Sequence, residues 1–166
     1  TQSVGITHIG RGLGVATSDY DGDGDTDLYV ANDGTINFFY QNEGAYFNEV
    51  SLQTGTRFNG YGLAEAGMGV DWADYDNDGD TDLYVTNFSA ETNTLYRNNS
   101  GYFTDVTQQV GLDQFTYVPL GFGTHFFDYD NDGFLDIFTS NGHVLDRIYE
   151  IDSTQHHAQQ NQLLRN

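Results

Sequence analysis

The chain has 166 residues, of which 25 are acidic and 5 are basic, so its formal net charge is −20. Its 12 Phe and 12 Tyr can fill a sizeable core, which excludes an acidic disordered chain. Nucleic acid and anionic membrane surfaces are poor partners, because few cationic side chains are available to neutralise phosphates. With no cysteine and no apolar run of membrane-spanning length, disulfide scaffolds, thiol chemistry and membrane insertion are not expected.

The first predicted strand of each of three repeats follows a Gly-x-Gly sequence, found at residues 12–14, 67–69 and 121–123. No helical pattern comes after these glycines, so a nucleotide-binding interpretation is poor. We expect instead that the glycines allow close backbone approach where strands crowd together.

A nine-residue acidic loop comes next in each repeat, at residues 19–27, 74–82 and 128–136. Acidic residues occupy loop positions 1, 3, 5 and 9, glycine occupies position 6, and position 7 needs only its backbone carbonyl. Calcium takes six to eight oxygen ligands at about 2.3–2.6 Å, so the pattern predicts three Ca²⁺ sites, with Mg²⁺ a weaker candidate. Without a cation the carboxylates of one loop repel one another, which predicts a structural role for the metal. The predicted metal ligands are Asp19, Asp21, Asp23, Asp25 and Asp27; Asp74, Asp76, Asp78, Asp80 and Asp82; and Asp128, Asp130, Asp132, Phe134 and Asp136.

An EF-hand is the obvious competing interpretation, and the residues after the loop exclude it. Position 12 is Val30, Val85 or Thr139 rather than the bidentate Glu of that motif. These residues belong to β-branched and aromatic runs that are typical of strands. The loop therefore joins two strands.

The remaining strands follow in the same order in each repeat. A third strand is predicted at 39–42, 95–98 and 163–166, and a fourth at 45–50 and 101–106 only. Four short strands with a period of about 55 residues predict an all-β fold of β-propeller-type, four-stranded antiparallel blades, three in a row with the third incomplete. The predicted units are residues 1–50, 51–106 and 107–166. The insertion at about 144–160 carries either a helical turn near 152–160 or a long loop of the kind often found on a binding face.

Three blades do not close a ring, since propellers typically have four to eight. We expect either a segment of a larger propeller or another copy that supplies the missing strand, because an uncovered strand edge is a template for pairing.

Other residues favour packing and surface roles over chemistry. Trp72 and the aromatic positions at 20, 75 and 129 and at 29, 84 and 138 are expected to pack between blades rather than to stack sugars. His143, His156 and His157 are expected at the surface, and His125 to face neighbouring side chains; no catalytic or zinc arrangement is apparent, so an enzyme is not predicted. Asn87 and Asn98 begin glycosylation sequons, and they either carry glycans or hold turns.

The segments 67–80, 82–87, 95–98 and 141–144 resemble the FG-GAP/VCBS repeats that form integrin-α-like propellers, in particular cartilage-acidic-protein-like members. The resemblance implies calcium at loop positions 1, 3, 5 and 9, an extracellular adhesion or ligand-binding role, and usually no catalysis.

Two functions follow as hypotheses. The first is a non-enzymatic, extracellular, secreted or cell-surface calcium-binding propeller module that contacts a protein or carbohydrate ligand. The alternative is a structural subunit that assembles edge to edge into a ring or a fibre, with further blades of the same or another copy as partners.

Overall fold

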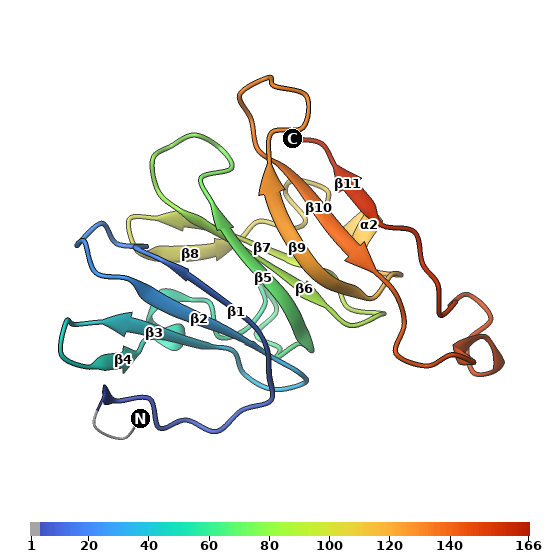
Figure 1. Cartoon of the computed structure of the whole chain (residues 1–166), viewed down its shortest axis with the longest axis horizontal. Helices are drawn as coiled ribbons and strands as arrows, with labels where there is room; N and C mark the ends of the chain where they lie inside the picture. The colour runs from blue at the N-terminus through green and yellow to red at the C-terminus, as the bar shows by residue number, and fades with distance from the viewer. Residues whose placement is uncertain (1–3) are drawn as a thin grey trace.

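The computed structural model describes residues 4–166 and shows three antiparallel sheets joined in sequence (Figure 1). We call these sheets the first, second and third blades. The fold-class prediction is confirmed, because the chain is all-β with almost no helix and the third blade has three strands instead of four. The strands are β1 (Gly12–Ser18), β2 (Asp27–Asn32), β3 (Phe38–Asn42) and β4 (Phe47–Glu49); β5 (Gly67–Ala73), β6 (Asp82–Asn87), β7 (Thr94–Asn99) and β8 (Tyr102–Asp105); and β9 (Gly121–Phe127), β10 (Asp136–Asn141) and β11 (Gln162–Leu164).

The first strands of the three blades, β1, β5 and β9, lie next to one another in space (Figure 1). The Gly-x-Gly sequences make this possible. A Cβ atom added at Gly14 would lie 2.4 Å from the carbonyl oxygen of Met68, and one added at Gly69 would lie 1.9 Å from that of Phe122. Since no side chain fits at those distances, the glycines permit the close backbone approach that the sequence predicts.

Large side chains fill the two wedges between the blades, as predicted for the aromatic positions of the first two blades and for Trp72. Tyr29 meets Trp72 edge to face, with ring centroids 6.1 Å apart and an interplanar angle of 89°. Two clusters result: Tyr20, Tyr29, Ala31 and Phe39 pack against Leu83, Val85, Tyr96 and Phe103, while Tyr84, Leu95, Val106 and Leu112 pack against Phe126 and Ile137.

The second strand of each blade shows which sheet faces remain uncovered. In β6 every residue is buried, because a blade covers each of its faces. Tyr29 and Tyr84 are 0% exposed, whereas Phe138, the equivalent residue of the third blade, is 36% exposed. On the first blade it is the opposite face that is open, with Val15 64% exposed. The first and third blades therefore leave opposite sheet faces uncovered. These are the two kinds of face that pack against each other in the wedges between neighbouring blades.

The structure differs from the sequence-based expectation in its few helical turns. A one-turn helix, α1 (Ser51–Thr54), ends at Gly55 in the left-handed conformation with φ 89°, and a second, α2 (Asp113–Thr116), precedes β9. The insertion has a 3₁₀ turn, η2 (Ile148–Glu150), instead of a helical turn near 152–160. One turn of helix is too short to produce a hydrophobic period, so the sequence pattern did not indicate α1 or α2.

Replacing Gly69 by alanine is expected to lower the free energy of unfolding by about 1–3 kcal/mol, because the methyl group forces β5 away from β9. Urea unfolding followed by tryptophan fluorescence measures this loss. The matched control is Gly123→Ala in the third blade, where the nearest heavy atom to an added Cβ is the Ser140 hydroxyl oxygen at 3.3 Å. Equal losses for the two variants would contradict the close approach.

Candidate metal centres

Each acidic loop folds in the same way around its first carboxylate. In the first loop Asp19 accepts hydrogen bonds from the backbone N–H groups of Asp23 and Gly24, at 3.1 and 3.0 Å. The other two loops repeat both bonds at Asp74 and Asp128, at 3.0–3.1 Å. In every blade, the backbone N–H groups at loop positions 5 and 6 therefore hold the carboxylate at position 1 in place.

Two left-handed residues turn the chain around this carboxylate. Loop position 6 is Gly24, Gly79 or Gly133, with φ between 91° and 96°. A Cβ added at any of the three would meet no atom within 4 Å, so the backbone conformation and not a lack of space favours glycine there. Position 4 has φ 74° at Gly22, 59° at Asn77 and 60° at Asn131, which is consistent with the tolerance of Asn for this region.

The ninth residue of each loop is a buried carboxylate at the start of the second strand. Asp27, Asp82 and Asp136 are at most 1% exposed. Each accepts one hydrogen bond from the backbone N–H of loop position 2 and one from the backbone N–H of the Asn at the end of the predicted third strand (Asn42, Asn98 or Asn166), all at 2.8–3.2 Å. Burial raises the pKa of Asp27 to about 6 and that of Asp82 to about 7, although these hydrogen bonds act in the opposite direction. A cation nearby would favour the charged forms again.

Three carboxylates in each loop are close enough together to bind one cation. Their oxygen atoms lie within 4.8 Å of one another in the sets Asp19, Asp21 and Asp27; Asp74, Asp76 and Asp78; and Asp128, Asp130 and Asp136. One oxygen of Asp76 is buried with no hydrogen-bond partner among residues 4–166. A donor set made only of oxygens suits a hard cation such as Ca²⁺, and the unpartnered oxygen is what a ligand position requires. The residues therefore fit a metal.

The sets differ between the loops: position 5 belongs to the set only in the second loop, position 9 only in the first and third, and position 7 in none. At position 5, one oxygen of Asp23 accepts the backbone N–H of Asp25 at 2.8 Å, and equivalent bonds of 2.9 and 3.0 Å occur in the other loops. At position 7, the side chain of Asp80 accepts the backbone N–H of Ser100 at 2.7 Å, and Phe134 is 47% exposed. Position 7 is thus left with its backbone carbonyl as the predicted ligand.

Comparison with protein families matches FG-GAP-like repeats to residues 19–85 and 74–139, which together span more than half of the chain. The chain belongs to the FG-GAP repeat family. This confirms the resemblance stated above, while the cartilage-acidic-protein-like subgroup stays a prediction. A comparison with curated proteins found no match. FG-GAP repeats are generally non-enzymatic and typically occur in extracellular proteins. Within residues 4–166, no helix has the length and apolar character needed to cross a membrane.

Sequence reasoning missed the residue that precedes the final Asn of the predicted third strand and contacts loop position 3 in the first and third FG-GAP repeats. The side-chain nitrogen of Gln41 binds Asp21 at 2.7 Å. In the third blade the guanidinium of Arg165 binds both Asp130 and Asp132, at 2.8 and 3.1 Å. The equivalent residue of the second blade is Arg97, and its buried Nε has no partner among the described residues. The sequence shows that the predicted third strand ends with Asn in all three repeats, but this pattern does not indicate what the residue before the Asn contacts.

The histidines differ from expectation in one case. His143 is buried rather than at the surface: its ring lies 5.4 Å from that of Phe88, and burial lowers its pKa. His125 contacts a neighbouring side chain as expected, since its Nδ1 lies 2.8 Å from Asp71 Oδ2 and so joins β9 to β5.

Both sequon asparagines are buried, at no more than 1% exposure. The side-chain nitrogen of Asn87 donates to Glu65 and to the carbonyl of Thr92. That of Asn98 donates to two backbone carbonyls. Since a glycan would displace these bonds, the structure favours the interpretation that both side chains hold the local fold.

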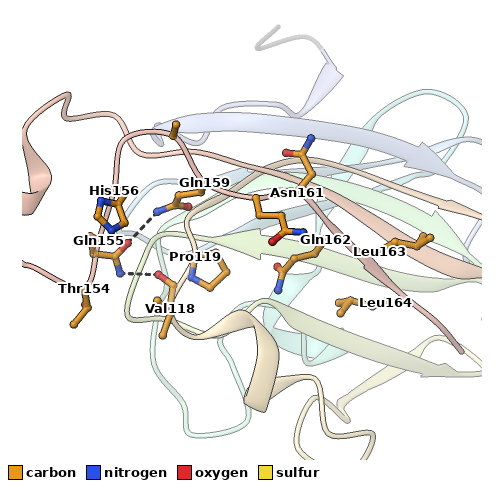
Figure 2. Close-up of a pocket in the computed structure, with 12 residues that line it drawn as sticks. Val118, Pro119, Thr154, Gln155, His156, Gln159, Asn161, Gln162, Leu163 and Leu164 are labelled. Atoms are coloured by element: carbon orange, nitrogen blue, oxygen red, sulfur yellow. Dashed lines mark hydrogen bonds between the residues drawn. The ribbon is translucent and has the colours of Figure 1, made fainter.

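The insertion encloses a hollow against residues 118–119, shown in Figure 2. Two of its amide side chains, Gln155 and Gln159, are engaged with the protein itself. Gln155 donates to the carbonyl of Val118 at 2.7 Å and accepts from Gln159 at 2.9 Å, and Gln159 also accepts the backbone N–H of Leu120. These bonds anchor the insertion to residues 118–120.

Replacing Arg165 by glutamine, the residue type found at position 41, is expected to raise the calcium affinity of the third loop. The guanidinium pairs with two carboxylates that a cation needs. Exposed ion pairs of this kind are weak, so the expected gain in affinity is about 1.4- to fivefold. The amide resonance of Gly133, followed by ¹⁵N NMR during a calcium titration, measures it.

The reciprocal variant Gln41→Arg should weaken the first loop, as reported by the amide of Gly24. An unchanged midpoint at both loops would contradict the competition between arginine and cation.

Proposed function

We propose that this chain is a non-enzymatic, extracellular FG-GAP propeller module that is stabilised by calcium and presents its surfaces to a protein or carbohydrate ligand. One observation supports it above the others: the same loop occurs in all three blades, and each copy gathers three carboxylates within 4.8 Å. Family membership supports the extracellular setting and the absence of catalysis.

The charge of the protein explains why calcium would be structural. With 25 acidic and 5 basic residues, repulsion opposes the compact state, and the loops concentrate that repulsion at the strand junctions. The buried carboxylate at position 9 adds a desolvation cost. A divalent cation in each loop would offset both costs, so the free energy of binding would stabilise the fold. Oxygen-only loops of this kind suit the high calcium concentrations outside cells.

A second function, assembly of copies into a ring or a fibre, is favoured by the uncovered sheet faces. Phe138 and Leu163 are 36% and 44% exposed on the third blade, although the equivalent residues of the first two blades are buried. Strand β11 pairs only with β10 among the described strands, so its other edge is unpaired. Further blades of the same or another copy are the partners that fit these surfaces, and head-to-tail contacts that fail to close produce filaments.

Thermal unfolding in calcium and in excess chelator tests the proposed function. At a calcium concentration of about 100 times Kd, each site contributes about 2.7 kcal/mol, so we expect the melting temperature to rise by about 5–10 °C per site. Magnesium at equal ionic strength is the control, and it should give a smaller shift. Identical melting curves in calcium and in chelator would contradict the proposal.

Light scattering in the same calcium buffer separates the two functions. A monodisperse monomer favours the module and opposes assembly, whereas closed rings or long polymers favour the structural subunit.

A further inference from the structure

Each blade has an asparagine at the end of the third strand that the sequence predicts, and two of these asparagines join the acidic loops by hydrogen bonds. The three asparagines are Asn42, Asn98 and Asn166. In every blade the backbone N–H of this asparagine donates to the position 9 carboxylate of its own loop, at 2.8–3.0 Å. Its side-chain nitrogen donates to the backbone carbonyl at position 8 of the same loop, at 3.1–3.3 Å.

In the second and third blades the same side chain also reaches the loop of the preceding blade. The Nδ2 atom of Asn98 donates to the carbonyl of Tyr20 at 3.0 Å, and that of Asn166 donates to the carbonyl of Tyr75 at 2.7 Å. Tyr20 and Tyr75 occupy position 2 of their loops, between the first two predicted ligands. Each asparagine therefore contacts two metal loops at once.

The contacts form an unbroken path from the first loop to the third. Asn98 links Tyr20 to Asp82, which accepts the backbone N–H of Tyr75 at 3.0 Å. The carbonyl of Tyr75 accepts from Asn166, which in turn contacts Asp136. Asn98 and Asp82 are 0% exposed, so water does not compete along this part of the path.

We propose that Asn98 and Asn166 are positioning residues that couple cation binding between neighbouring loops, so that the three loops fill cooperatively. A cation in one loop fixes its positions 1 and 3, and with them the peptide at position 2 between them that the next asparagine contacts. The neighbouring loop then has less conformational freedom to lose when it binds its own cation, which gives positive coupling. The inference rests on the proposed calcium function.

The chain contains its own control for this role. Asn42 makes the same contacts with its own loop, to Asp27 and to the carbonyl of Thr26, and it accepts the N–H of Gly44 in the turn after β3. No blade precedes it among residues 4–166, and its side chain contacts no second loop there. Asn42→Ala therefore removes the local role alone, while Asn98→Ala removes the local role and the bridge.

A calcium titration of the ¹⁵N-labelled chain followed by NMR tests the coupling. The amides of Gly24, Gly79 and Gly133 each donate to the first carboxylate of their own loop, so they report the three loops separately. Asp76→Asn removes a predicted ligand of the second loop. The measurement is the calcium affinity of the first loop, followed through the amide of Gly24. We expect this substitution to weaken the first loop about fivefold in the wild-type background, a typical size for coupling between sites. The same weakening is expected in the Asn42→Ala background, and less than about 1.5-fold in the Asn98→Ala background.

The comparison distinguishes a bridge from long-range charge effects, because Asn98→Ala changes no charge. If Asn98→Ala does not fold, Asn166→Ala provides the same test on the third loop, since Asn166 is exposed and retains its backbone bond. An equal effect of Asp76→Asn in all backgrounds would overturn the coupling and leave the proposed function standing. If calcium shifts none of the three glycine amides, the proposed function itself fails.

Discussion

Repulsion between carboxylates at three strand junctions is the interaction on which the rest of this structure depends. Each acidic loop connects the innermost strand of a blade to the second strand, which forms the middle of the sheet. Backbone N–H groups satisfy the first and ninth carboxylates, yet they do not neutralise them, and one oxygen of Asp76 has no partner among the described residues. The carboxylates at the junctions are therefore held by hydrogen bonds, but their negative charge is not compensated. We propose that a bound cation compensates it.

The packing between blades depends on the same junctions. Position 2 of the loop is aromatic in every blade, and Tyr20 is buried in the first wedge beside Phe39, with ring centroids 4.5 Å apart. The contact of Asn98 with the preceding loop crosses that wedge at its loop end, and the contact of Asn166 crosses the second wedge in the same way, while the glycines of β1 and β5 bring the inner strands together. The acidic loops and the apolar wedges therefore belong to the same interface between neighbouring blades. This arrangement explains how a property of an exposed turn can affect the stability of a buried cluster.

Much of the fold could be predicted because local sequence decides it. The Gly-x-Gly sequences, the acidic loops and the strands after them recur with little change, and the structure places β1, β5 and β9 and the loops where the repeats indicate. The misses have a common physical cause. The burial of His143, the contact of Arg165 with Asp130 and the bridge from Asn98 to Tyr20 depend on residues far apart in sequence, which no local pattern encodes. One-turn helices such as α1 escaped because they are shorter than the period that reveals a helix.

The most direct measurement is a crystal structure of the protein grown in calcium, with anomalous scattering used to locate the ions. Three peaks are expected, one in each loop, with carboxylate oxygens of positions 1, 3, 5 and 9 and the backbone carbonyl of position 7 at about 2.3–2.6 Å. A folded chain whose three loops hold only water in calcium-containing buffer would contradict the account.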